Sequence, residues 1–218
     1  MDFFPLYNSI RISLISSVIT LILGITLAWF ITKSPSIFKG FLDALLTVPM
    51  VLPPTVIGFL ILVVISPKSY FGGLISTFLG KNLTMTWQAS IIAVVVITFP
   101  IMYRTVRSSF ESLDKNLVYA GQTLGLRNST VFLKIILPNC KTGIVAGFVL
   151  SFARGLGEYG ATSMVSGFIP KNTATISTTV AYYWQTSQDE KAIFWVLLNL
   201  GISFVVMCVV NLLERKKY

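Results

Sequence analysis

Residues 119–138 read YAGQTLGLRNSTVFLKIILP, and hydrophobic segments lie on both sides of this long polar stretch. A helix over residues 117–124 is expected to stop at Gly125, because glycine suits the left-handed conformation in which many helices end. Residues 128–130 carry side-chain oxygens that suit the N-cap of a second helix, and Pro138 is expected to end or kink that helix. The stretch therefore predicts a helix–turn–helix at a membrane surface, shaped to be gripped by a protein beneath the bilayer.

The composition indicates that most of the chain lies in a membrane. Of its 218 residues, 54% are hydrophobic and 11% are charged, whereas soluble domains are about 25% charged. A soluble fold could not cover so much apolar surface, so we expect an all-α, polytopic transmembrane bundle. One transmembrane domain is expected to use the whole chain.

Five hydrophobic segments are predicted to cross the bilayer as helices. They are residues 12–32, 42–65, 87–103, 143–165 and 192–213. The first has about 21 residues and covers roughly 31 Å, which matches the hydrocarbon thickness. Residues 66–86 are too short and polar to cross, and their apolar spacing predicts a segment that lies partly flat on the outer surface. Residues 166–191 are expected to form a second polar loop.

The distribution of lysine and arginine between these segments predicts the orientation. The larger set comprises Lys33, Lys39, the six basic residues of the loop 104–141, and Arg215, Lys216 and Lys217. Because cytoplasmic loops carry the excess of basic residues, this set should be cytoplasmic, with the N-terminus outside and the C-terminus inside. This placement accounts for the net charge of +9, so no nucleic-acid partner is expected.

Three prolines interrupt the second predicted span, at Pro49, Pro53 and Pro54. Proline removes a backbone hydrogen bond, which is tolerated at membrane depth inside a bundle or beside a cavity. The span is expected either to line a cavity or to be a passively kinked structural helix. Both interpretations remain open from the sequence.

The fourth predicted span contains SFARGLGEYGATS, residues 151–163, with two charges at membrane depth. Arg154 and Glu158 are four residues apart, so on a helix they share a face and can pair. Charges inside a span usually face a bundle interior or a water-filled path. The pair is expected either to shape a gate for an anion or to be a static buried pair that fixes helix register. Since a carboxylate repels an oxyanion, Glu158 is expected to orient Arg154 or the backbone.

The stretch 119–138 resembles the "EAA loop" of permease subunits in ABC importers, whose pattern is E-A-A-x3-G-x9-I-x-L-P. Five residues match the pattern with its spacing intact: Ala120, Gly125, Ile135, Leu137 and Pro138. Tyr119 stands where that family usually has Glu, and Gly121 where it usually has Ala. The resemblance implies that the loop 104–141 couples the membrane domain to a cytoplasmic ATPase.

Two longer segments resemble the molybdate permease subunits in particular. FARGLGEYGAT, followed by IPKNTATI, is similar to their F-A-R-x-L-G-E-[FY]-G-A-T…I-P…T-x-T-[IL] stretch, and LLTVPMVLPPTVIGF is similar to their LPLVLPPTVxG stretch. The likeness covers residues 8–212 and implies a type I importer permease for molybdate. Because sulfate and thiosulfate permeases share the ARxLGE[FY]GA element, tungstate, sulfate or thiosulfate are the alternative cargoes. The residues expected at the path or gate are Pro53, Pro54, Thr55, Arg154, Glu158 and Thr162.

The partners and cofactors follow from the same resemblance. It implies a second copy of this subunit, two cytoplasmic ATPases and an external oxyanion-binding protein at the cell membrane. The chain lacks a G-x4-G-K-[ST] phosphate loop and histidine, so we expect no enzyme activity, no bound metal, and ATP with Mg²⁺ on the partner. An ATP-independent channel or secondary transporter, and a non-transporting membrane scaffold, are the rival classes.

Overall fold

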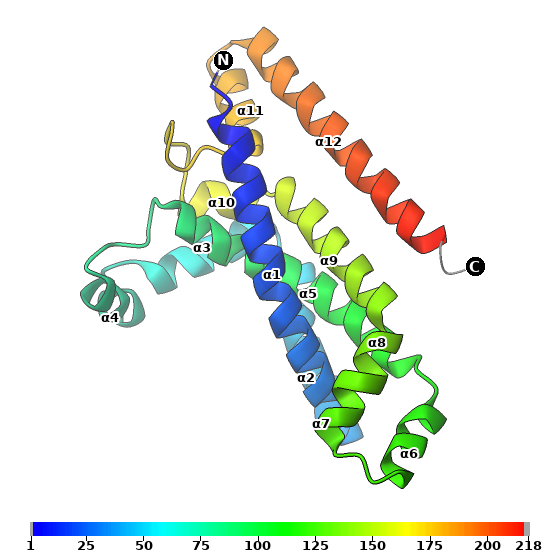
Figure 1. The fold of residues 1–218 in the computed structure, drawn as a ribbon. Helices are drawn as coiled ribbons and strands as arrows, with labels where there is room; N and C mark the ends of the chain where they lie inside the picture. The colour runs from blue at the N-terminus through cyan, green and yellow to red at the C-terminus, as the bar shows by residue number, and fades with distance from the viewer. Residues whose placement is uncertain (1, 216–218) are drawn as a thin grey trace.

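The computed structural model describes residues 2–215, and every regular element in that range is a helix (Figure 1). In chain order the elements are α1 (Phe4–Thr32), α2 (Ser36–Thr47), η1 (Val48–Met50), α3 (Pro54–Ile65), α4 (Tyr70–Leu79), α5 (Trp87–Glu111), α6 (Lys115–Thr123), α7 (Asn128–Val131), η2 (Phe132–Ile136), α8 (Leu137–Asn139), α9 (Lys141–Leu156), α10 (Gly160–Val165), α11 (Ile176–Gln185) and α12 (Asp189–Arg215). The all-α prediction is confirmed. Lys216 and Lys217, which entered the charge count above, lie outside the described residues.

By length and composition, three helices of the described chain could cross a membrane: α1, α5 and the Asp189–Cys208 part of α12. Two bent pairs of helices raise the number to five if each pair is one span. The first pair joins Phe38–Met50 to Pro54–Ile65 at 102°, and the second joins Asn128–Asn139 to Lys141–Leu156 at 69°. The count and bounds of the five spans stay predictions.

The second predicted span is broken rather than kinked, because prolines cluster at the corner. Pro53 is extended, with φ −55° and ψ 136°, and Pro54 occupies the first turn of α3. A proline in the first turn needs no backbone donor, and the residue before a proline is pushed out of the helical region. The helical chain, which passes from α2 into η1, therefore ends at Met50, and α3 starts at Pro54.

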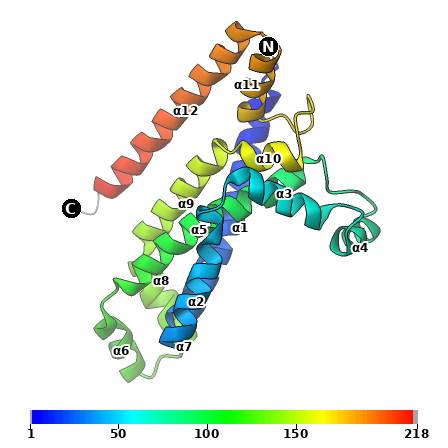
Figure 2. The ribbon, with the colours of Figure 1, turned by 180° about the vertical axis from the view of Figure 1, so that it is seen from behind.

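Helix α5 forms the axis of the bundle, with α1 and α9 packed along it (Figures 1 and 2). Two apolar clusters share this helix. The coupling-end cluster comprises Ala28, Ile31, Met102, Tyr103, Val106, Phe110, Val131, Ile136 and Cys140. The broken-helix cluster comprises Ile57, Ile65, Ala89, Ala93, Ile97, Ala161 and Val165. Pro100 of α5 is buried at the boundary between them.

The N-terminal turns of α1 hold the loop that follows α10. Helix α1 begins at Phe4, ahead of the apolar stretch. The Nδ2 amide of the buried Asn8 donates to the carbonyl of Ala174 at 3.0 Å, and the Ser9 hydroxyl accepts from the Ile176 amide at 2.8 Å. Residues 166–191, expected to be only a loop, contain α11, which starts with a Thr175 capping box. These turns lie opposite to α6 and α7 along the molecule (Figure 1).

Candidate functional site

The fourth predicted span is interrupted at Gly157–Tyr159, between α9 and α10. Glu158 lies in this interruption and is 2% exposed. Its Oε1 accepts a hydrogen bond from the Ala161 amide at 2.8 Å, at the start of α10. Its Oε2 lies 2.8 Å from Nη1 of Arg154 on α9. The expected pairing is therefore present, but it bridges a helix break instead of lying along one continuous helix.

The two members of this pair differ in accessibility. The Glu158 side chain is 1% exposed, whereas the Arg154 side chain is 37% exposed. Arginine has five N–H donors in a rigid fork, and one of its nitrogens is used by the carboxylate. The fixed carboxylate thus orients a guanidinium that keeps donors for another acceptor.

Thr162 supports the interruption from within the fold. It is 1% exposed, and its hydroxyl donates to the carbonyls of Glu158 and Tyr159, each at 3.1 Å. Its own carbonyl accepts from the Ser166 hydroxyl at 2.8 Å. The structure therefore places Thr162 in a backbone-bracing position and not on an open surface.

The proline corner and the α9–α10 interruption lie against each other. A Cβ built at Gly160 would lie 2.9 Å from Cβ of Pro54, and one built at Gly58 would lie 2.7 Å from Cα of Ala161. Pro53 and Thr55 are exposed, and Pro54 is half-buried. The two stretches expected at the gate therefore cross at backbone contact. Sequence reasoning missed Gly58, although a glycine beside a proline corner is a signal of close packing.

The predicted helix–turn–helix is present at the far end of the bundle. Helix α6 is capped by Asp114, whose carboxylate accepts from the Asn116 amide at 2.9 Å. It ends before Gly125, which has a left-handed φ of 73°. The Leu126 amide then donates to the Gly121 carbonyl at 3.2 Å and closes the turn.

The expected N-caps of the second helix are wrong. Arg127 is the N-cap, with φ −63° and ψ 147°, and it makes no side-chain cap bond within the described structure. Residues 128–130 already lie inside α7, so their side chains are past the capping position. The Asn128 carboxamide oxygen instead accepts from Nε2 of Gln122 at 3.4 Å, across the turn.

Pro138 is preceded by a π-helical turn, η2. The Leu137 amide donates to the Phe132 carbonyl five residues back. Such a wide turn often accommodates a local disruption of the helical ladder. The chain continues as α8 through Pro138 and bends at Cys140, so Pro138 lies just ahead of the corner and does not itself end the segment.

The remaining motif residues lie on two faces of this segment. Gly121 is buried, and a Cβ there would lie 2.6 Å from Cδ1 of Ile135, so an alanine would have to displace the end of that flexible side chain. Tyr119, Ala120 and Pro138 are exposed, and Ile135 and Leu137 are half-buried. Four leucines give the outer face an apolar character: Leu117, Leu124, Leu126 and Leu133.

A charged network that the sequence did not reveal ties α2 to α5. Arg107 of α5 pairs with Asp43 of α2, and its Nε lies 3.0 Å from Oε1 of Glu111. Lys39 of α2 binds the same Glu111 oxygen at 2.5 Å. The sequence signal was Asp43, an acidic residue at the start of a predicted span.

Comparison with known proteins identifies the family. A family model described as "Binding-protein-dependent transport system inner membrane component" matches residues 20–217. The chain belongs to this family. A molybdenum transport system permease protein of Escherichia coli K12 is 33% identical over 95% of this chain and 91% of its own. A putative molybdenum transport system permease protein of Bacillus subtilis is 31% identical over 94% of this chain and 90% of its own length.

A sulfate permease protein and two solved structures are also similar to this chain. A sulfate transport system permease protein of Salmonella typhimurium is 28% identical over 93% of this chain and 73% of its own. A chain of a bacterial alginate ABC transporter has a TM-score of 0.78 at 16% identity, covering 98% of this chain and 78% of that one. An amino acid ABC transporter chain has a TM-score of 0.67 at 18% identity, covering 95% and 90%. The fold is that of type I importer permeases, and the chain is a multi-pass membrane protein.

Proposed function

We propose that this chain is the permease subunit of an ATP-driven importer that moves molybdate across the cytoplasmic membrane. The observation that carries the proposal is its similarity to molybdenum permease proteins at 31–33% identity over nearly the full chain. The sulfate permease relatives make sulfate or thiosulfate, together with tungstate, the second candidate cargo.

The path is proposed to run between two copies of this subunit, past the junction of the two broken spans. Arg154 supports this placement, because a partly exposed guanidinium held by a buried carboxylate can donate charge-assisted bonds to an oxyanion. The exposed Pro53 and Thr55 lie at the same junction. Glu158 acts as a positioning residue for Arg154.

The helix–turn–helix is proposed to bind a cytoplasmic ATPase, whose movements would reach the gate through this contact. Its apolar tip suits a groove on a partner, since Leu124 is 79% exposed. Its buried face belongs to the coupling-end cluster, and α5 continues from that cluster to the broken-helix cluster. ATP and Mg²⁺ would bind to the partner, so this subunit has no catalytic role.

The proposed orientation places the helix–turn–helix in the cytoplasm and the N-terminus outside. It rests on the distribution of basic residues and on the opposite placement of the two ends (Figure 1). Residues 66–86 and 166–191 would then meet the external oxyanion-binding protein.

The test is uptake of labelled molybdate by proteoliposomes containing this subunit, its ATPase and its binding protein. Molybdate uptake should require ATP, and tungstate should compete more strongly than sulfate. Stronger competition by sulfate would reassign the cargo within the oxyanion class. Uptake without the ATPase would indicate a channel or secondary transporter, and ATP turnover that does not respond to any oxyanion would indicate a scaffold.

A further inference from the structure

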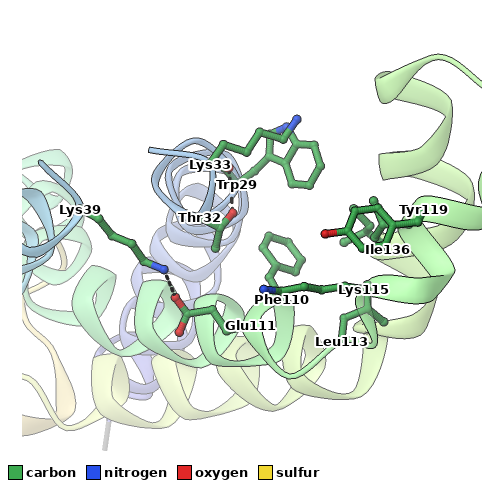
Figure 3. Close-up of a pocket in the computed structure, with 11 residues that line it drawn as sticks. Trp29, Thr32, Lys33, Lys39, Phe110, Glu111, Leu113, Lys115, Tyr119 and Ile136 are labelled. Atoms are coloured by element: carbon green, nitrogen blue, oxygen red, sulfur yellow. Dashed lines mark hydrogen bonds and ion pairs between the residues drawn. The ribbon is translucent and has the colours of Figure 1, made fainter. Parts of the chain in front are cut away.

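A pocket of about 460 Å³ opens between the last turn of α1 and the start of α6, at the coupling end of the bundle (Figure 3). Its floor is apolar and continuous with the coupling-end cluster. Phe110 and Ile136 are buried in the floor, at 9% and 4% exposure, with Trp29 and Val118 half-buried beside them. This size is within the range of small-molecule sites, and the floor suits a hydrocarbon segment.

The rim of the pocket is cationic. Lys33 follows α1, Lys39 lies on α2, and Lys115 begins α6. Figure 3 shows Lys33 beside Trp29 on one wall, with Lys115 and the Tyr119 phenol reaching in from the α6 side. Nζ of Lys33 lies 3.7 Å from the centroid of the Trp29 ring. Charged and phenolic donors therefore converge over an aromatic floor.

The carboxylate that lines the pocket is already neutralised. Glu111 binds Lys39 at 2.5 Å and Nε of Arg107 at 3.0 Å. Lys33 and Lys115 therefore set the charge that an occupant meets, and both are exposed. The occupant should carry an anionic group with several acceptor oxygens next to an apolar portion.

We propose that this pocket binds the phosphate of an anionic phospholipid of the inner leaflet, with the adjoining hydrocarbon against Trp29 and Phe110. Basic pockets between helices at the cytoplasmic surface favour anionic head groups, because that leaflet is negatively charged. The proposal rests on the orientation in the proposed function. A free oxyanion would leave the apolar floor uncovered, so the lipid is the better match.

An anion-binding pocket would explain why position 119 is tyrosine, where the EAA pattern has glutamate. A glutamate at position 119 would add a second carboxylate to the pocket, whereas the tyrosine adds a neutral O–H donor. The bound lipid would bridge Lys33 after α1 and Lys115 on α6. It would thereby brace the coupling segment, which is the helix–turn–helix of residues 115–139, against the bundle.

The test is native mass spectrometry of the subunit–ATPase complex, purified with equal amounts of phosphatidylglycerol and phosphatidylcholine. The wild-type complex should retain phosphatidylglycerol preferentially. The double variant Lys33→Gln/Lys115→Gln should lower that retention roughly 25-fold, because each juxtamembrane lysine contributes about fivefold. Lys33→Arg/Lys115→Arg should retain the lipid.

The matched control is Lys134→Gln/Lys141→Gln, which removes the same charge from the coupling loop. Both lysines are exposed, and neither lines this pocket in the described part of the chain. Equal loss in the two glutamine pairs would overturn the proposal, as would unchanged retention in the pocket variant. Release of the lipid by millimolar phosphate or molybdate would assign the pocket to a free anion. If the lipid is retained only when the ATPase is absent, the pocket is a contact surface for the ATPase in the complex.

The orientation is checked separately. In a chain whose two cysteines are replaced by serine, Lys115→Cys should react with an impermeant thiol reagent only from the cytoplasmic side. Labelling from outside would reject the proposed orientation. Lipid retention in detergent does not depend on sidedness or transport, so the two failures are distinguishable.

Discussion

The two apolar clusters along α5 are packed in different ways. The coupling-end cluster is filled by large side chains, and around it the rings of Trp29 and Phe132 lie 4.4 Å apart. The broken-helix cluster contains Ala89, Ala93 and Ala161, and there α3 and α10 approach at backbone distance through Gly58. The coupling end is thus packed through aromatic rings, whereas the crossing of α3 and α10 is packed backbone to backbone.

This contrast has a consequence for motion. Helices whose large side chains interlock cannot shift past one another easily, so they are expected to move together. Where α3 and α10 meet at Gly58, no interlocking side chains have to separate before the two helices slide or move apart. With Pro100 buried at the boundary, α5 is suited to carry movement from the coupling segment to the crossing.

The largest effect should come from filling the crossing of α3 and α10. Gly58→Leu would bring a Cβ to 2.7 Å from Cα of Ala161, so the two helices must separate. We expect a loss of stability of about 3 kcal/mol, at the upper end for overpacked sites. The measurement is thermal unfolding of the purified protein.

Gly157→Leu is the matched control for that substitution. Gly157 is exposed, and no described atom outside its own neighbours lies within 4 Å of a Cβ built there. Its φ of −89° is open to any residue. Equal destabilisation by the two leucines would show that the crossing is not closely packed.

The second-largest loss of stability should come from replacing Glu158, the buried carboxylate between α9 and α10. Glu158→Ala removes the partner of Arg154 and the acceptor for the Ala161 amide, so we expect a loss of about 2 kcal/mol. Arg154→Gln should cost a similar amount, because it leaves a carboxylate that is 1% exposed without its counter-charge. If Arg154 meets the cargo, this variant should also lower uptake at least about tenfold, the effect of losing one charge-assisted bond.

These two measurements separate the gate from the static pair. A static pair predicts that uptake by Arg154→Gln falls only in proportion to the folded fraction. Full uptake at unchanged abundance would therefore reject the anion contact and leave Arg154 a structural role.

Local patterns in the sequence predicted some of these features and missed others. The Arg154–Glu158 pairing follows from a spacing of four residues, and the turn at Gly125 follows from glycine. The polar start of α1 was left out of the first span because its partners are distant: Asn8 bonds Ala174, which lies 166 positions away. The failed N-cap prediction has a local cause: the backbone leaves the helical region at Arg127, so residues 128–130 already lie inside α7.

The corner angles could not be predicted either. Prolines in residues 49–54 indicate a disruption but not its angle; the two helices meet at 102°, and beyond the corner α3 packs on α10. Helix α11 was missed because its first turn is rich in threonine and serine, residues that also favour loops. Its capping box at Thr175 is the signal that could have revealed it.

The smallest stability effect should come from the exposed turn of the coupling segment, where it also separates function from folding. Gly125→Ala forces a non-glycine residue to a φ of 73°, at a cost of about 1 kcal/mol. Gly80→Ala is a matched control, because Gly80 ends α4 with a φ of 62°, and both sites have open space in the described structure. Both variants should lose the same stability in thermal unfolding.

If the turn at Gly125 is the contact site for an ATPase, only Gly125→Ala should reduce co-purification of that partner and ATP-dependent uptake. The turn carries the exposed Leu124 and Leu126, whereas the end of α4 lies on a separate arm of the molecule (Figure 2). Equal losses of partner binding in the two variants would show that general destabilisation causes the effect. The turn at Gly125 would then not be a specific contact for the ATPase.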